Sequence, residues 1–404
     1  HLFRHHSAKI VATLTRVFGS RHLDLAEDVV QDALVKALQQ WPFKGVPENP
    51  AAWLTLVARN RALDLLRRDA SLASKADELE LALPHHASPA VASDVEMDDQ
   101  LALILMCCHP ALPIEYQIAL TLKTACGFST AEIARAFLTP QTTIAQRLVR
   151  AKRQIRDHNI VIDPPSADDL PGRIDSVLRV IYLLFNEGYA ATSGDDLVRG
   201  DLCEEAMRLG TLVINHSRLP LPAAHALLAL MMLQAARLPA RTLEDGTLAV
   251  LAEQNRELWD RKLLARGMRH FGASAGGDTI TTYHLQAEIA AVHAAAMTDL
   301  DTDWPKLVEL YDDLYKLEPT PIVLLNRAIA ISRCRGPRAG LTALEEIDPH
   351  DSLRNYHLLP AVAAELWKQA GDNQRAAQAY HRALECPCSA PERAFLETQL
   401  RRLT

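Results

Sequence analysis

The hydrophobic residues of the chain recur in many stretches with the 3.6-residue period of amphipathic helices. This pattern predicts helices over residues 1–20, 22–41 and 49–68. Between the second and the third, residues 41–50 hold three prolines and one glycine, which predicts a loop. Residues 70–98 lack strong periodicity, and the helical pattern then resumes.

The second predicted helix begins with acidic residues. Asp24 is expected to cap it, with Glu27 at the spacing of a capping box. Its polar face carries a stripe at helical spacing, made of Asp28, Gln31 and Asp32. The opposite, apolar face contains Val29, Ala33 and Ala37. By itself the stripe is compatible with an ordinary solvated helix face.

Residues 129–156 predict two short helices joined by a turn. Ser129 and Glu132 have capping-box spacing at the start of the first helix. Thr139 is expected to cap the second helix, with Pro140 in its first turn. Helix, short turn and helix is the arrangement of a helix-turn-helix, whose second helix enters the major groove of DNA.

The two sides of this second helix differ in chemistry. Apolar residues share one face, namely Ile144, Leu148, Ala151 and Ile155. Polar and basic residues suited to duplex DNA lie on another side, namely Thr142, Thr143, Gln146, Arg147 and Arg150. Phosphate contacts are expected from Arg150, Lys152, Arg153 and Arg156. A helical hairpin with a solvated basic face would show the same pattern.

The last third of the chain contains repeat-like elements. Residues 358–387 predict two helices joined at Gly371, with small alanines where the helices cross. Residues 320–349 and 283–319 are weaker copies. A period of roughly 34 residues is typical of tetratricopeptide repeats, which stack and form concave binding surfaces.

Composition and charge agree with a modular, helical protein. A chain of 404 residues with 49% hydrophobic residues has enough material for two or three domains. Residues 1–76 carry 11 basic against 7 acidic residues, and residues 115–160 carry 7 against 3, so each has a net charge of +4. The stretch between them has a net charge of −7, and residues 161–404 have −8. Basic islands in an acidic chain are candidate contacts for a polyanion.

Several other classes of site are not expected. Seven scattered cysteines do not match a disulfide framework and favour a reduced, cytoplasmic setting. The apolar stretch 223–236 is short for a membrane span, and no signal segment opens the chain. No zinc-binding spacing or nucleotide-binding motif is present, so neither a metal nor another cofactor is predicted. Adjacent Cys107, Cys108 and His109 are expected to be packed in a core.

The motifs together resemble a known family. Residues 22–41 followed by 49–68 resemble region 2 of bacterial sigma factors, and residues 111–156 resemble region 4. Because only a linker separates them, the layout is similar to that of the extracytoplasmic-function (ECF) class. Residues 176–213 and the repeats resemble the ECF group that has a long tetratricopeptide-like C-terminal extension.

For region 2, the resemblance implies two contacts. The stripe of Asp28, Gln31 and Asp32 would dock on the β′ clamp helices of core RNA polymerase. The loop 42–50 would capture a base of the melted −10 element. The single strand would be held by Arg59, Asn60, Arg61, Arg67 and Arg68. Trp53 either stacks on a base or belongs to the core.

For region 4, the resemblance implies contact with the β flap of polymerase and with duplex −35 DNA. The polar side of the second helix would face that DNA, with Lys152 and Arg153 on phosphates. Many relatives have a basic residue where Ala145 stands and a serine where Gln146 stands. The base preference of this chain therefore stays open.

We therefore predict an all-α, cytoplasmic protein that is not an enzyme. Its expected parts are region 2 (1–70), a linker (71–98), region 4 (99–160), a helical extension (161–280) and tetratricopeptide-like repeats (281–404). The predicted function is promoter recognition as a sigma factor, with a repeat domain that regulates activity or binds a protein or small-ligand partner. The alternatives are a stand-alone helix-turn-helix regulator and a scaffold that does not bind DNA.

Overall fold

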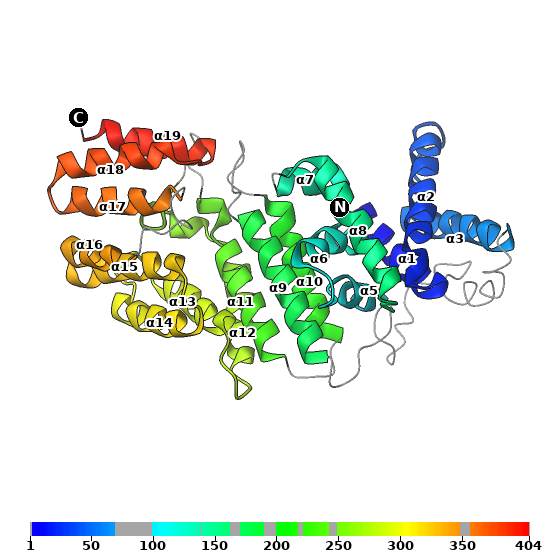
Figure 1. The fold of residues 1–404 in the computed structure, drawn as a ribbon, viewed down its shortest axis with the longest axis horizontal. Coiled ribbons are helices and arrows are strands. Elements are labelled where there is room, and N and C mark those ends of the chain that lie inside the picture. Colours follow the sequence, from blue (N-terminus) through cyan, green and yellow to red (C-terminus); the bar gives the residue numbers. More distant parts are fainter. Residues whose placement is uncertain are drawn as a thin grey trace. The chain divides into compact units, whose positions relative to one another are not determined.

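The computed structural model describes residues 2–68, 99–137, 139–161, 170–189, 199–216, 221–241, 249–347 and 356–403. In these residues every regular element is helical, which confirms the predicted all-α fold (Figure 1). The chain forms two compact units, His1–Ile181 and Tyr182–Thr404. The predicted linker 71–98 lies outside the described residues.

The first unit contains the segments that resemble sigma regions 2 and 4. Its helices are α1 (Leu2–Phe18), α2 (Leu23–Lys44), α3 (Pro50–Arg68), α5 (Asp99–Cys107), α6 (Ile114–Leu120), α7 (Thr130–Ala136) and α8 (Gln141–Asp157). A π-helical segment, Thr121–Ala125, extends α6. Helix α9 (Leu170–Tyr189) contributes residues to both units.

Helix α2 differs from its prediction at both ends. It begins at Leu23 with His22 in the cap position, so Asp24 lies inside the first turn and does not cap the helix. The helix continues through Pro42 to Lys44, which shortens the predicted loop. A proline this close to the end removes a single helical hydrogen bond. Gly45, with φ +82°, then ends the helix.

The helix-turn-helix follows its prediction in most details. Ser129 N donates to Glu132 Oε2 at 2.7 Å, and Glu132 N donates to Ser129 Oγ at 3.1 Å, which confirms this capping box. The cap of α8 is Pro140 rather than Thr139, because the Thr139 hydroxyl donates to Phe137 O at 2.9 Å instead. The predicted apolar face of α8 is buried, namely Ile144, Leu148, Ala151 and Ile155.

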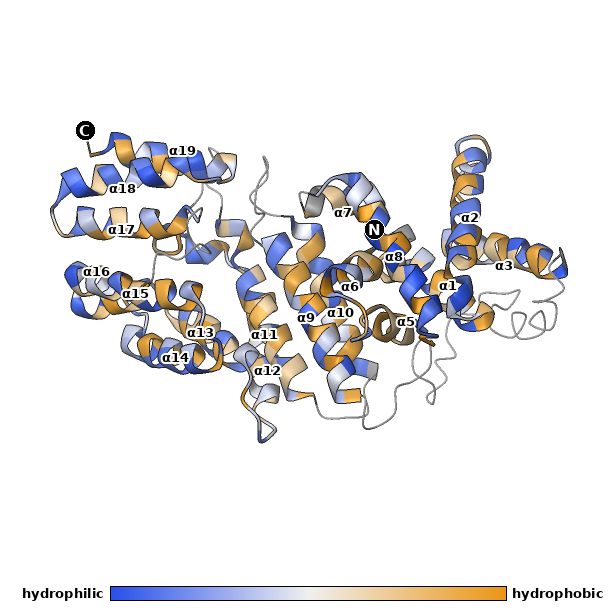
Figure 2. Ribbon diagram, viewed as in Figure 1, coloured by the Kyte–Doolittle hydropathy of each residue, from blue (hydrophilic) through white to orange (hydrophobic). Residues whose placement is uncertain are grey.

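The core of the first unit joins its N-terminal and C-terminal helices. Helix α1 packs against α2, α3 and α5, and α6 packs against α8. Apart from Asp99, every residue of α5 is buried, and Figure 2 shows its apolar character. Cys107 and Cys108 are fully buried as predicted, whereas His109 is only half-buried. Burial raises the pKa of the Cys108 thiol to about 12.

The second unit is a succession of helices that contact their neighbours along the chain. These helices are α10 (Gly200–His216), α11 (Pro222–Ala235), α12 (Arg261–Ser274), α13 (Thr282–Ala295), α14 (Trp304–Leu317), α15 (Pro321–Arg335), α16 (Pro337–Glu345), α17 (Leu358–Gln369), α18 (Asn373–Glu385) and α19 (Ala390–Arg401). The pairs α13–α14, α15–α16 and α17–α18 coincide with the three predicted repeat units. Gly371, with φ +84°, permits the turn of the last pair.

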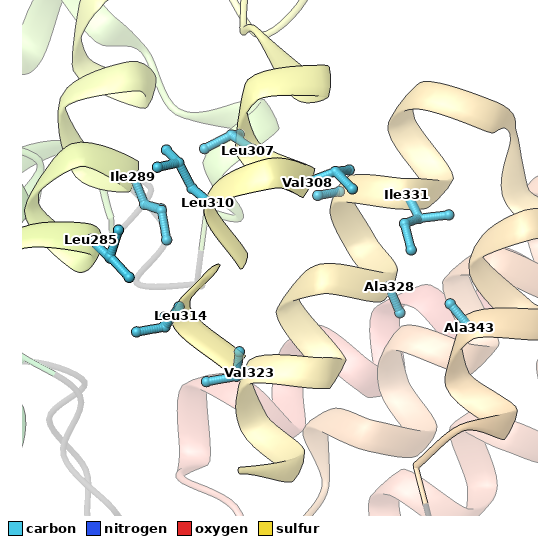
Figure 3. Close-up of a cluster of buried hydrophobic side chains, with 11 residues drawn as sticks. Leu285, Ile289, Leu307, Val308, Leu310, Leu314, Val323, Ala328, Ile331 and Ala343 are labelled. Carbon is cyan, nitrogen blue, oxygen red and sulfur yellow. The ribbon is translucent and has the colours of Figure 1, made fainter. Parts of the chain in front are cut away.

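Two apolar regions hold the second unit together. Helix α11 packs against α10, α12 and α13. Its apolar stretch, Pro222–Ala240, has 19 residues and is longer than predicted, so by length and composition it could cross a membrane. Because 67% of its most apolar part is buried, the stretch also fits the central helix of a folded unit. The second region spans α13 to α16, and Figure 3 shows its side chains, including Leu285, Leu310, Val323, Ile331 and Ala343.

Gly340 of α16 allows the repeat helices to approach closely. A Cβ atom at this position would lie 2.5 Å from Ser332 Cβ and 3.0 Å from Leu366 Cδ1. We expect Gly340→Ala to lower the free energy of unfolding by about 1–3 kcal/mol, because this contact has no room for a methyl group. Urea denaturation followed by circular dichroism measures the change.

Gly272→Ala is the matched control for this prediction. Gly272 lies in helix α12, and a Cβ atom there would have no neighbour within 4 Å. This change should therefore be neutral or stabilising by up to about 1 kcal/mol, because alanine favours a helix more than glycine does. Equal effects of the two changes would contradict the close packing at Gly340.

Candidate nucleic-acid interface

The polar side of α8 presents the residues predicted to contact duplex DNA. Thr142, Gln146 and Arg150 are exposed, and Thr143 and Arg147 are half-buried. These five residues share one face of the helix, because they occur at helical spacing along its first three turns. The apolar face behind them packs on α6 and α7, so the polar side is held on a rigid support.

Lys152 does not lie on this surface, contrary to the prediction of a phosphate contact. Its Nζ donates to Asp24 Oδ1 at 2.6 Å and to Glu27 Oε2 at 2.7 Å, and only 14% of its side chain is exposed. The hydroxyl of Thr124 donates to Glu27 Oε1 at 2.6 Å. Burial lowers the pKa of Lys152, but the charges of Glu27 and Asp24 and their hydrogen bonds raise it above its ordinary value. Lys152 is therefore bound to α2.

Other polar contacts also connect α8 and the residues after it to the start of α2. Arg156 pairs with Asp24 at 3.3 Å. Ser20 Oγ donates to the carbonyl of Ile160 at 2.6 Å. Helix α8 and the residues that follow it are thus attached to the start of α2. These contacts were missed because they join residues more than 120 positions apart, beyond the range of periodicity and capping signals.

Arg153 is exposed, and its predicted contact with phosphate stays a prediction. Its side chain is 76% exposed, and its partner Asp157 lies on the same helix at 3.3 Å. Such an exposed pair contributes about 0.3–0.5 kcal/mol and can exchange its partner readily. Arg153 is therefore accessible to a phosphate, whereas Lys152 is not.

The acidic stripe of α2 lies on the surface. Asp28, Gln31 and Asp32 are all exposed. The opposite face is buried as predicted, at Val29, Ala33 and Ala37. Asp32 accepts a hydrogen bond from Arg61 Nε at 2.8 Å, so two residues predicted to bind different partners bind each other. Both side chains are about half exposed, and such surface pairs are worth at most about 1 kcal/mol.

The residues predicted to hold single-stranded DNA differ in how far their side chains are exposed. Asn60 and Arg67 are exposed, and Arg61 is half-buried. Arg59 is 1% exposed, so its position in this structure contradicts its predicted contact with DNA. The reason is its place on α3, beside buried Ala58 and one turn before buried Leu63. The side chain of Arg68 lies outside the described residues.

Two tryptophans lie beside this surface. Trp53 packs edge-to-face against Trp41, with ring centroids 5.4 Å apart, and both rings are half-buried. This contact favours the core alternative for Trp53 over stacking on a base. The pairing brings the end of α2 against the start of α3 and so positions the short loop between them.

Three large apolar side chains near the end of α2 are exposed, which was not predicted. Leu38 is 76% exposed, Phe43 89% and Val46 64%. Leu38 and Phe43 are five positions apart on α2, so they point to different sides of the helix. Phe43 and Val46 fall in the segment predicted to capture a base. The prolines of that segment interrupt the helical pattern, so the pattern contained no sign of this exposure.

No cluster in the described part of the chain is suited to a metal ion. Among those residues, no group of three His, Cys, Asp or Glu side chains is placed to bind one. The arrangement instead offers a basic, polar helix face on α8 and an acidic stripe on α2, followed by three exposed apolar side chains. These surfaces suit macromolecular binding.

Comparison with known proteins identifies both halves of the first unit. A sigma-70 region 2 model matches residues 2–71, and a sigma-70 region 4 model matches residues 102–155. A family of unknown function, DUF6596, matches residues 173–275. No solved structure matches the chain significantly.

Two relatives extend these matches. The uncharacterized protein R00370 of Rhizobium meliloti (strain 1021) is 37% identical over 398 residues, which cover 96% of this chain and 92% of that protein. The ECF RNA polymerase sigma factor SigE of Mycolicibacterium smegmatis (strain ATCC 700084 / mc(2)155) is 26% identical over 166 residues, which cover 39% of this chain and 60% of SigE.

The ion pairs of Lys152 lead to a stability prediction. Glu27→Gln keeps the size of the side chain but leaves the buried ammonium of Lys152 with one carboxylate partner. We expect the free energy needed to separate α8 from α2 to fall by about 1–3 kcal/mol. Hydrogen exchange of peptides that cover the two helices should then be about tenfold faster or more.

Asp157→Asn is the control, because it breaks the exposed pair with Arg153 on the same helix. Its effect should stay within about 0.5 kcal/mol. If exchange in α2 and α8 is the same in both variants, the contact does not hold the two parts together.

Proposed function

We propose that this chain acts as a sigma factor of the ECF class. The chain belongs to the same family as the uncharacterized protein R00370 of Rhizobium meliloti, and it carries the two domains of a sigma factor. The single observation that carries the proposal is the succession of a sigma-70 region 2 and a sigma-70 region 4 in one chain. The two domains imply binding to core RNA polymerase and to promoter DNA. We place this activity in the cytoplasm and assign no covalent chemistry to the chain.

Polymerase binding is assigned to α2. The exposed stripe of Asp28, Gln31 and Asp32 can meet basic residues of the β′ clamp helices, because charges of opposite sign favour encounter and fix orientation. Region 4 would contact the β flap. The exposed apolar side chains of Leu38, Phe43 and Val46 support a binding role for this end of α2, since a partner would remove them from water.

Single-stranded −10 DNA is assigned to the exposed side of α3 and the loop before it. Asn60, Arg61 and Arg67 offer an amide and two guanidinium groups for bases and phosphates. The pair of Arg61 with Asp32 would have to break for Arg61 to reach DNA, at small cost for a surface pair. The buried Arg59 is not included in this surface.

Duplex −35 DNA is assigned to the polar side of α8. Arg147 and Gln146 can form paired hydrogen bonds with guanine and adenine, and Arg150 and Arg153 can contact phosphates. Thr142 and Thr143 complete this face near the start of the helix. In the structure, Lys152 at the edge of this surface is bound to α2. We infer that the described arrangement is a closed form, which loosens when the two domains bind separate promoter elements.

The second unit is assigned a regulatory or partner-binding role. Its three helical pairs support tetratricopeptide-like stacking, and the close approach at Gly340 is consistent with such an array. Repeats of this kind present extended surfaces to other molecules. A transcription regulator that binds DNA alone is the second candidate, and the helix-turn-helix is the observation that favours it.

A charge reversal on α2 tests the polymerase contact. Asp28→Arg/Asp32→Arg places two positive charges where the β′ helices are expected to be basic. Run-off transcription with core enzyme should fall about tenfold or more, and co-elution with core polymerase should be lost. If the double variant transcribes normally, the assignment of α2 fails, and the second candidate gains support.

The matched control is Glu309→Arg/Asp313→Arg on α14. This acidic pair is exposed and has the same four-residue spacing on a helix, but it belongs to the second unit. Transcription should be unchanged, because the control alters the net charge of the chain equally without changing α2.

A pair of substitutions on α8 separates base contacts from phosphate contacts. Arg147→Ala should weaken −35 duplex binding by about 1–3 kcal/mol and relax the preference for one base. Arg153→Ala should weaken binding to all DNA sequences alike. It should also reduce the slope of log affinity against log salt concentration by about one. Fluorescence anisotropy with duplex libraries at several salt concentrations measures both. Identical base preferences in wild type and Arg147→Ala would contradict direct base contact by Arg147.

A further inference from the structure

A cavity of about 680 Å³ lies within the second unit. Helices α11, α13, α14, α15, α17, α18 and α19 contribute to its wall, together with residues 250–253. Sites for small organic molecules typically have volumes of about 300–1,000 Å³, so the cavity is large enough for one. Neither sigma domain contributes to it.

One end of the cavity is polar and basic. Arg237, which follows α11, lines this end, and its Nε is buried without a hydrogen-bond partner among the described residues. Arg256 lies nearby, and its guanidinium donates to the carbonyls of His293 at 2.8 Å and Ala296 at 2.6 Å. The Cζ atoms of Arg237 and Arg256 lie 5.8 Å and 4.9 Å from the ring centroid of Trp259. Two guanidinium groups are thus brought together on one tryptophan.

The titratable groups around this end respond to the two positive charges. Burial, followed by the charge of Arg237, lowers the pKa of Arg256 against the opposing effect of Asp301. Burial, Arg237 and Arg256 together lower the pKa of His293 to about 4, so its imidazole is neutral at pH 7. Burial raises the pKa of Tyr311 to about 12 against the opposing effect of Arg237, so its hydroxyl stays protonated. Arg237 is therefore accompanied by two neutral polar groups.

Most acidic residues of the wall already have a basic partner. Asp299 binds Arg333, Glu365 binds Lys368, and Glu392 lies 3.4 Å from His357. The remaining one, Glu253, is exposed and forms no ion pair with the described residues. Arg237 likewise has no ion pair with the described residues, so within that part of the chain no carboxylate is paired with its charge. An anion would offset the repulsion between Arg237 and Arg256.

The rest of the wall is mostly apolar. Trp304 stands beside the basic end, with its ring centroid 5.6 Å from that of His293. Further along, the apolar side chains of Ile289, Ile329, Val362, Leu366 and Phe395 share the wall with polar ones, among them Glu365, Lys368, Gln369 and Gln399. A ligand that fills this space must therefore combine an anionic group with an apolar body.

We propose that this cavity binds a small carboxylate with an extended apolar body, and that the carboxylate pairs with Arg237. The hydroxyl of Tyr311 provides a second hydrogen bond to the carboxylate. The body lies along α15, α17 and α19. The inference concerns the second unit alone and requires neither polymerase nor DNA, so its test is independent of the proposed sigma activity.

The test uses the full-length chain and three probes, octanoate, decanoate and 3-phenylpropionate. Isothermal titration calorimetry should give saturable binding of one molecule per chain for at least one of them. The corresponding uncharged amide should bind at least about tenfold more weakly, because it cannot form the ion pair with Arg237. If no carboxylate binds at millimolar concentration, or if amide and acid bind equally, the proposal is overturned.

Two variants and one control locate the carboxylate. Arg237→Gln should weaken carboxylate binding about tenfold or more, and Tyr311→Phe about threefold or more. Arg338→Gln changes an exposed arginine of α16 outside the cavity and should bind like the wild type. Unchanged affinity in both cavity variants would overturn the proposed position of the ligand.

The stability of the ligand-free chain separates binding from folding. Arg237→Gln should leave the unfolding midpoint unchanged or raise it, because it removes one of two neighbouring positive charges. Decanoate should raise the midpoint of the wild type and of Arg338→Gln, but not that of Arg237→Gln. If Arg237→Gln fails to fold, the Tyr311→Phe titration alone decides, since that change keeps the ring and removes only the hydroxyl.

Discussion

Lys152 brings a positive charge into the contact between α8 and α2, where only 14% of its side chain remains exposed. A charge in such a place must have a partner, because an unpaired buried ion is strongly unfavourable. Glu27 and Asp24 provide that partner, and Thr124 satisfies the second oxygen of Glu27. The attachment of α8 to α2 therefore depends on a small group of charged and polar atoms. Polar contacts of this kind can be exchanged for contacts with phosphates, whereas an extended apolar interface would have to be exposed to water.

The second unit is stabilised differently. Its helices pack on their neighbours along the chain through alanine, leucine and isoleucine side chains, and small residues such as Gly340 set the distance between them. The charged residues of its cavity are mostly paired, but Arg237 and Arg256 share a confined space around Trp259. The first unit thus uses a paired buried charge to join α8 to α2, and the second has, beside its cavity, an arginine without an ion pair among the described residues.

Much of this architecture was predictable from periodicity. The helical segments, the buried face of α8 and the capping box of Ser129 all depend on residues within a few positions of each other, so the sequence pattern contained the necessary information. Asp24 and Glu27 were misinterpreted because the local pattern of a cap resembles that of a helix whose first-turn carboxylates have a distant partner. Arg59 was placed on the surface because it is charged, although its position on α3 turns it towards the interior. The arginine pair at Trp259 joins segments that no local pattern relates.

The wall of the cavity begins at Gln234 and is completed by Gln399, in α19. A growing polypeptide emerges from the ribosome N-terminal end first, and its domains tend to fold as they emerge. Both sigma domains can therefore form while the cavity is still open on one side. Any molecule that needs the complete wall can be captured only by a chain whose synthesis has passed α19, so nascent and finished copies of the protein would differ in what they can bind.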